Sequence, residues 1–221
     1  QWQIDRSFIL DSLNKKIFST ANVPYKIRDD EKILKDPKNT IDFDHALHQK
    51  IMNDVKKIGT DARLVLDQDQ VVHVSMAEKL LVLQLSKLSN FIPDGGIWLN
   101  TQRPEWNDAN NALVGYGVSM VTLYYLNRHI SFINKVLTDV NETEFEMSNE
   151  VLAWFKDTKK TYEKYSPSVN ERLDAVERKT FVQELQKLFS NYRQKTYNKS
   201  SSGRDKIKVI DIINFNNLVL A

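Results

Sequence analysis

Apolar residues recur at helical spacing along most of the chain. Spacings of three and four residues predict helices over about 7–18, 42–58, 75–91, 118–137, 147–165, 181–192 and 207–220. Two of these, 75–91 and 118–137, carry apolar residues on more than one face, which is typical of helices buried on several sides. By contrast, 147–165 and 181–192 show a single apolar stripe and are expected as outer helices. Two β-prone runs around a polar tetrad at 63–73 predict one small hairpin.

The alternation of all-round apolar and one-sided helices indicates an all-α fold in which outer helices surround inner ones. We therefore expect 1–221 to form a single helical domain, with a flexible polar loop at 198–205. The chain has no initiator Met and ends on the apolar run 218–221. Both features predict a fragment of a larger catalytic domain.

Residues that break regular structure are scarce and unevenly placed. Six Gly and five Pro make about 5% of 221 residues, where an average chain has roughly 12%. Six of these eleven residues fall between Pro93 and Gly117, between the two most apolar predicted helices. We call residues 93–117 the window. A long loop held between two buried helices is a favourable place for a functional site.

Composition excludes several classes of protein. The absence of cysteine excludes a disulfide scaffold and a zinc–thiolate site, and His45 and His48 alone are too few to predict a metal site. The chain has 31 basic and 29 acidic residues of mixed order, which argues against a nucleic-acid partner. No apolar run is long enough to span a membrane. The start lacks a secretion signal, which favours the cytoplasm.

The side chains of the window suit a sugar ligand. A pyranose offers an apolar face that stacks on an aromatic ring and a rim of hydroxyls that carboxylates, amides and Arg can bind. The candidate catalytic residues are Glu105, Asp108 and Asp94, and the candidate substrate-binding residues are Trp98, Arg103, Trp106, Asn107, Asn110, Asn111 and Tyr116. Glu105 precedes Trp106, and a carboxylic acid beside an indole can keep its proton near neutral pH. Such an acid can protonate the leaving oxygen of a glycosidic bond.

The segment Glu105-Trp106-Asn107-Asp108-Ala109-Asn110 resembles the Asp-Trp-Asn-Asp-Gly-Met segment of the cellobiose and chitobiose phosphorylases. These enzymes belong to the six-hairpin glycosidases, whose catalytic domain is an (α/α)6 barrel with its site in loops at one end. The longer stretch 94–126 is similar to uncharacterised bacterial proteins of that superfamily. The present chain differs in having Glu in place of the leading Asp, and Ala109-Asn110 in place of Gly-Met.

The resemblance implies part of an (α/α)6 barrel acting on an oligosaccharide or disaccharide by an inverting mechanism. Glu105 would be the general acid, and Asp108 would hold a sugar hydroxyl or orient the loop. The acceptor would be water or inorganic phosphate, with no other cofactor. A hydrolase needs a second carboxylate about 6.5–9.5 Å away, either Asp94 or a residue outside this chain. The other half of the barrel would be missing sequence or a second copy of the chain.

A different class of function stays open from the residues alone. The chain could be a non-catalytic helical module that binds a carbohydrate or a protein partner. In that case Glu105 would be a hydrogen-bonding residue only.

Overall fold

Helices make up most of the computed structural model, which describes residues 6–100, 112–169, 172–197 and 203–221. The α-helices of these ranges are α1 (Arg6–Asn14), α2 (Asp30–Lys35), α3 (His45–Ile58), α4 (Met76–Leu88), α6 (Met120–Thr138), α7 (Asn149–Val169), α8 (Ala175–Tyr197) and α9 (Val209–Leu220), with a 3-10 turn η1 (Thr60–Arg63). None of the helices in these ranges combines the length and apolar character that crossing a bilayer requires.

Several helices begin and end at residues that cap them. The side chain of Ser75 accepts a hydrogen bond from the amide of Glu78 at 3.2 Å, and Asp44 accepts one from Leu47 at 2.9 Å. These bonds satisfy amides that have no partner inside the helix. Gly59 follows α3 with a φ of +82°, a backbone conformation that favours glycine. The predicted end of the second helix at Gly59 is therefore confirmed.

The expectation of an all-α chain is wrong. The strands of the described ranges are β1 (Tyr25–Ile27), β2 (Ile41–Phe43), β3 (Leu66–Asp67), β4 (Gln70–Val71), β5 (Phe91–Ile92), β6 (Gly96–Trp98), β7 (Val118–Ser119), β8 (Glu144–Ser148) and β9 (Arg204–Lys208). They pair antiparallel as β1–β2, β3–β4, β5–β6–β7 and β8–β9. Only β3–β4 corresponds to the predicted hairpin. Residues 204 and 205, expected in the flexible loop, begin β9.

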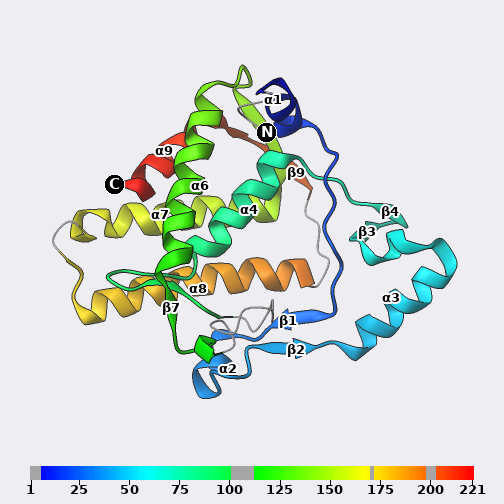
Figure 1. Ribbon diagram of the computed structural model, residues 1–221, viewed down its shortest axis with the longest axis horizontal. Helices are drawn as coiled ribbons and strands as arrows, with labels where there is room; N and C mark the ends of the chain where they lie inside the picture. Colours follow the sequence, from blue (N-terminus) through cyan, green and yellow to red (C-terminus); the bar gives the residue numbers. More distant parts are fainter. Residues whose placement is uncertain (1–5, 101–111, 170–171, 198–202) are drawn as a thin grey trace.

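The part of the chain that the structure describes also shows no barrel of paired inner and outer helices. Helix α7, expected on the outside, contacts α4, α8 and α9 and lies at the centre of the helical layer (Figure 1). Helix α6, expected to be buried on several sides, buries one face and exposes the opposite one. The expected positions of α6 and α7 are therefore wrong, because the apolar face of a helix does not show which elements pack against it. The expectation that the chain forms part of an (α/α)6 barrel is therefore also wrong.

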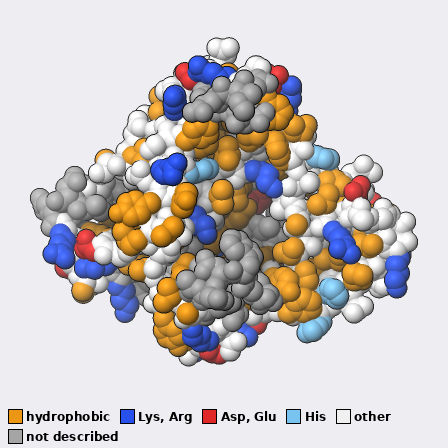
Figure 2. Space-filling view, viewed as in Figure 1, with side chains coloured by type: hydrophobic (Ala, Val, Ile, Leu, Met, Phe, Trp, Pro, Cys, Tyr) orange, Lys and Arg blue, Asp and Glu red, His pale blue; other side chains and the backbone are white. Residues whose placement is uncertain are grey.

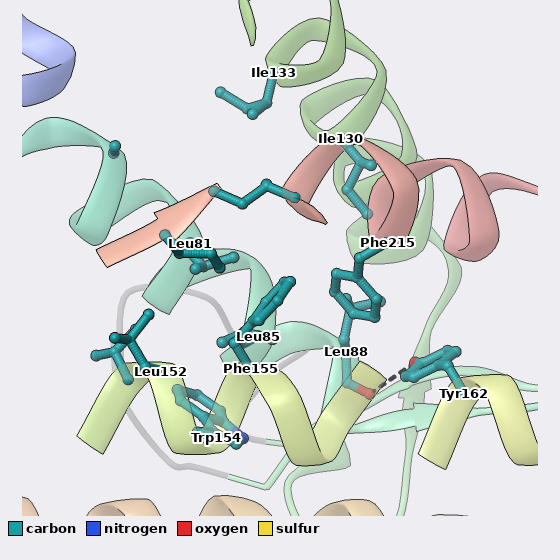
Figure 3. Packing of buried hydrophobic residues seen from close by; sticks show 14 of the residues in the cluster. Leu81, Leu85, Leu88, Ile130, Ile133, Leu152, Trp154, Phe155, Tyr162 and Phe215 are labelled. Atoms are coloured by element: carbon teal, nitrogen blue, oxygen red, sulfur yellow. Dashed lines mark hydrogen bonds between the residues drawn. The ribbon is translucent and has the colours of Figure 1, made fainter. Parts of the chain in front are cut away.

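The hydrophobic core lies between α4, α6, α7, α8, α9 and the β8–β9 sheet. Figure 3 shows Leu85 of α4, Phe155 of α7 and Phe215 of α9 together in this core. The rings of Phe155 and Phe215 meet edge to face with 5.3 Å between centroids. The hydroxyl of Tyr162 donates to the carbonyl oxygen of Leu88 at 3.2 Å, so the end of α4 is fixed to α7. Strand β5, which leads into the window, begins three residues after Leu88.

The segment between α1 and α4 runs along the outside of this core. It carries β1–β2, α2, α3 and β3–β4, and α3 lies at the edge of the molecule (Figure 1). Helix α2 returns to the body and packs against α8, where Arg193 lies 3.7 Å from Asp30. This return brings the linker between α2 and β2 to the window.

Candidate functional site

The window is anchored by the β5–β6–β7 sheet. In this sheet Phe91 pairs with Ile97, and Trp98 pairs with Val118. The ladder continues beyond the strands, because the amide of Leu99 donates to Gly117 at 3.0 Å and the amide of Gly115 donates to Leu99 at 2.7 Å. Residues 99 and 115–117 are thus held side by side. The two ends of the intervening loop are fixed by backbone hydrogen bonds.

Seven of the predicted site residues lie outside the described residues. They are Glu105, Asp108, Arg103, Trp106, Asn107, Asn110 and Asn111. The structure describes Asp94, Trp98 and Tyr116, together with the buried Asn100 at the start of the loop. These residues define the surroundings of the loop ends.

Trp98 and Tyr116 lie on the two sides of the loop base. The indole nitrogen Nε1 of Trp98 donates to the carbonyl oxygen of Gly115 at 3.1 Å, so this half-buried side chain ties the two ends together. Tyr116 is 66% exposed, and the ammonium of Lys38 lies 5.3 Å from its ring centroid. An exposed ring next to a cation can take up a polar ligand with an apolar face.

The linker Asp36–Asn39 was not among the predicted site residues, but the fold brings it to the end of the window. Lys38 donates from Nζ to the carbonyl oxygen of Ala112 at 2.8 Å, a contact between residues 74 positions apart in sequence. The backbone of Pro37 lies so close to Gly115 that a Cβ on Gly115 would be 1.8 Å from the Pro37 oxygen. Asp36, whose carboxylate accepts a hydrogen bond from the Asn39 side chain, therefore lies one residue from this contact. No local pattern in the sequence marks these residues.

Asp94 lies at the other end of β6. It occupies the turn between β5 and β6 with a φ of +62°, and its carboxylate pairs with Arg172 Nε at 3.5 Å and Arg178 Nη2 at 3.7 Å. A strand rises about 3.3 Å per residue, so β6 and its flanks separate this turn from the loop base by on the order of 10 Å. The two guanidinium groups give Asp94 a role in holding the hairpin to α8 and the residues before it.

The described residues contain no cluster of three or more His, Asp or Glu side chains arranged to hold a metal ion. His45 and His48 both contact the ring of Phe43, with 4.7 Å and 5.5 Å between ring centroids. Their position is explained by this aromatic contact.

The geometry thus gives a loop with a rigid base, an exposed tyrosine, a lysine and a carboxylate from a distant part of the chain. Such a set can bind a polar ligand by stacking and hydrogen bonding. Compared with known proteins, the chain matches no family model and no curated protein sequence.

Proposed function

We propose that the window binds an oligosaccharide or disaccharide and that Glu105 protonates the leaving oxygen of a glycosidic bond. The observation that best supports this proposal is that backbone hydrogen bonds join the two ends of the loop. Leu99, Gly115 and Gly117 hold the two ends of the loop together, next to the exposed ring of Tyr116. Backbone hydrogen bonds at the base of a loop that carries an acid, an indole and several amides support this proposal, because a binding site needs a fixed support.

In this function the aromatic rings stack on the sugar and the polar groups bind its hydroxyls. Trp98 and Tyr116 flank the loop base, and Trp106 belongs to the loop itself. The side chains that bind hydroxyls would be Arg103, Asn107, Asp108, Asn110 and Asn111. Bond cleavage transfers the proton of Glu105 to the leaving oxygen while water or inorganic phosphate attacks the anomeric carbon.

A hydrolytic reaction also needs a base that accepts a proton from the attacking water. Asp94 is a poor candidate because two arginines already bind its carboxylate at the far end of β6. Asp36 fits better, since it adjoins Pro37, whose carbonyl contacts the loop end at Gly115. The Asp36 side chain is exposed, as a group that exchanges protons with water must be.

Replacing Glu105 by Gln tests the proposal. The amide keeps the size of the side chain but has no acidic proton to transfer, so turnover of cellobiose or chitobiose should fall about 100-fold to 10,000-fold while binding is retained. Free sugars as the only products indicate hydrolysis, and a sugar phosphate formed together with a free sugar indicates phosphorolysis. Glu31→Gln on the exposed side of α2 serves as a control and should keep full turnover. Unchanged turnover in Glu105→Gln would remove Glu105 as the acid.

A non-catalytic carbohydrate-binding module is the second candidate. It is favoured by the engagement of Asp94 with Arg172 and Arg178, which leaves the window without its expected second carboxylate. Binding of cellobiose or chitobiose without turnover by the unmodified protein, in water and in phosphate, would favour this candidate.

A further inference from the structure

Residues 18–74, which we call the arm, connect α1 to α4 and stay outside the hydrophobic core. Among the described residues, no side chain of the arm belongs to that core or packs against its edge. The apolar side chains that are buried in the arm, Ile33, Ile51 and Ala62, lie apart from it. Figure 2 shows the α3 end of the arm at the side of the molecule, with basic and His side chains on its surface. The arm therefore does not share the hydrophobic burial that stabilises the helical body, α4 and α6–α9.

The two ends of the arm are paired with each other next to the body. Phe18 and Val74 exchange two backbone hydrogen bonds, of 3.1 and 2.8 Å. Lys79 of α4 donates from Nζ to the carbonyl oxygen of Ser19 at 2.6 Å and holds these paired ends in place. Beyond them, β1 pairs with β2, β3 pairs with β4, and α3 packs against η1. Because these contacts are made within the arm, its local structure does not depend on contact with the body.

The far end of the arm meets α8 through polar contacts. Gln194 donates from Nε2 to the carboxylate of Asp29 at 3.0 Å. The hydroxyl of Tyr197 accepts a hydrogen bond from the backbone amide of Ile27 at 3.1 Å. Each of these bonds contributes little net free energy, because water binds the same groups when the two surfaces are apart.

The ion pair between Arg193 and Asp30 lies in the same contact and is imperfect. Nη2 of Arg193 is 3.7 Å from the carboxylate of Asp30, and among the described residues this buried nitrogen has no hydrogen-bond partner. Burial raises the pKa of Asp30 and lowers the pKa of Arg193, so both charged groups lose hydration in the contact. The cost of removing two charges from water offsets much of their attraction. The arm is consequently held against α8 only weakly.

The position of α2 also determines the position of the linker. Helix α2 ends at Lys35, and the linker Asp36–Asn39 follows it directly. In the docked arm Lys38 donates to the carbonyl oxygen of Ala112, and Pro37 lies against Gly115. When α2 leaves α8, the linker must follow, and these contacts with the end of the window are lost.

We propose that the arm undocks as a unit from α8 and from residues 112–115, turning about its paired ends while the helical body stays folded. The docked arm covers the end of the window at Gly115, and the undocked arm uncovers it. Asp30 and Arg193 control the balance between the two forms. This inference goes beyond the proposed function and does not depend on which ligand the window binds.

The distance between spin labels on α2 and α8 tests the proposal. The chain has no cysteine, so Leu34→Cys and Lys187→Cys, both at exposed positions, can each carry one label. Arg193→Met leaves the carboxylate of Asp30 without its cation in the docked form. In this variant the fraction of molecules with a second, longer distance should rise at least about tenfold.

Two further variants sharpen this comparison. Asp30→Asn removes the other partner of the ion pair and should also raise the fraction with the longer distance at least about tenfold. Arg28→Met removes an ion pair with Asp42 inside the arm, where the atoms are 2.7 Å apart, and should leave the distances unchanged. If both ion-pair variants keep the single distance of the unmodified protein, the proposal is wrong.

Hydrogen exchange of backbone amides distinguishes undocking from unfolding. Tyr197 of α8 protects the amide of Ile27, whereas Thr40 inside the arm protects the amide of Arg28 with a 2.9 Å bond. Undocking of an intact arm predicts that each ion-pair variant accelerates exchange at Ile27 about tenfold and leaves Arg28 and Phe155 of the core unchanged.

Equal acceleration at Ile27 and Arg28 would show that the arm unfolds instead of undocking, and would overturn the proposal. Acceleration at Phe155 in one variant indicates that this variant has lost global stability, and the other ion-pair variant then decides. Acceleration at Phe155 in both variants would show that the arm and the core open together, which also overturns the proposal.

Discussion

Arg204 donates a 2.5 Å hydrogen bond from Nη2 to the buried carboxylate of Glu78, which lies 126 residues earlier in the chain. Glu78 belongs to the first turn of α4, and Arg204 begins β9. The same carboxylate accepts a 2.7 Å bond from the hydroxyl of Ser148 at the end of β8. A buried charge is tolerated only when it is paired and hydrogen-bonded, and here both conditions are met. This contact joins the helical core to the β8–β9 sheet.

Replacing Arg204 by Met should therefore destabilise the fold. The substitution leaves the carboxylate of Glu78 buried without its cation, which typically costs about 3 kcal/mol or more. Chemical denaturation of the two proteins measures the difference. Lys206 lies in β9 like Arg204, and Lys206→Met breaks its exposed pair with Glu144 of β8, where Nζ and the carboxylate oxygen are 3.2 Å apart. This change should cost less than about 1 kcal/mol. Equal losses in the two variants would contradict the role given to Glu78.

Gly115 should tolerate no side chain. Its φ is +79°, and a Cβ would lie 1.8 Å from the carbonyl oxygen of Pro37. Gly59 has a similar φ of +82° but no atom within 4 Å of its missing Cβ. Both Gly→Ala variants carry backbone strain of about 1–3 kcal/mol, and the steric clash is added only at Gly115. Gly115→Ala should consequently unfold at a lower denaturant concentration than Gly59→Ala, and it should lose sugar binding. Equal unfolding midpoints in the two variants would show that Pro37 does not contact Gly115 closely.

The stability of the protein should fall as the pH drops below about 6.5. Burial lowers the pKa of His129 from its ordinary value of 6.5, so the unfolded chain binds a proton more readily than the folded one. The contribution of His129 is complete above 6.5 and is lost as the pH falls from there toward the lowered pKa. Unfolding free energies of the unmodified protein and of His129→Gln, measured from pH 8 to 5, should converge or cross at the acid end. Parallel curves would contradict this prediction.

Asp36 and Asp94 should respond differently to conversion to Asn. Asp36→Asn should lower hydrolytic turnover by about 100-fold or more, since a general base is lost. Asp94→Asn should mainly lower stability, by less than about 1 kcal/mol, because its ion pairs are partly exposed. Kinetic assays and denaturation of both variants check this. A larger loss of turnover in Asp94→Asn than in Asp36→Asn would indicate that Asp94 is the general base.

The local elements of the fold could be predicted where the signal is local. The helix expected over 75–91 is present as α4, which Ser75 caps, and the hairpin expected at 63–73 is present as β3–β4. Helix α3 begins after Asp44 rather than Asp42, because Asp42 belongs to β2 and pairs with Lys26. A capping residue is recognised by type, but a strand partner sixteen positions away is not visible in the local pattern.

The β8–β9 sheet could not be predicted for the same reason. Met147 fits a helical stripe with the apolar residues that follow it, yet it alternates with Phe145 in β8 and lies opposite Asp205. The sequence Arg204–Lys208 is almost entirely polar and has one buried side chain, Ile207. This segment becomes a strand because it pairs with β8, so its secondary structure is determined by tertiary context.

The window itself was located from the clustering of Gly and Pro, but its surroundings were not. Trp98 and Tyr116 lie at the loop base, as residues of the window must. Lys38 and Pro37 reach it through the return of α2 to the body of the protein. A contact across 74 positions has no counterpart in composition or periodicity.

The most direct test of a sugar site in the window is the indole N–H spectrum of the protein during titration with cellobiose or chitobiose. The chain has four tryptophans, of which Trp98 and Trp106 belong to the window and Trp154 is buried between α7 and α8. If the window binds sugar, the signals of Trp98 and Trp106 shift with a saturable dependence on sugar concentration, while the signal of Trp154 stays in place. Unchanged signals from both window tryptophans at every sugar concentration would contradict sugar binding in the window.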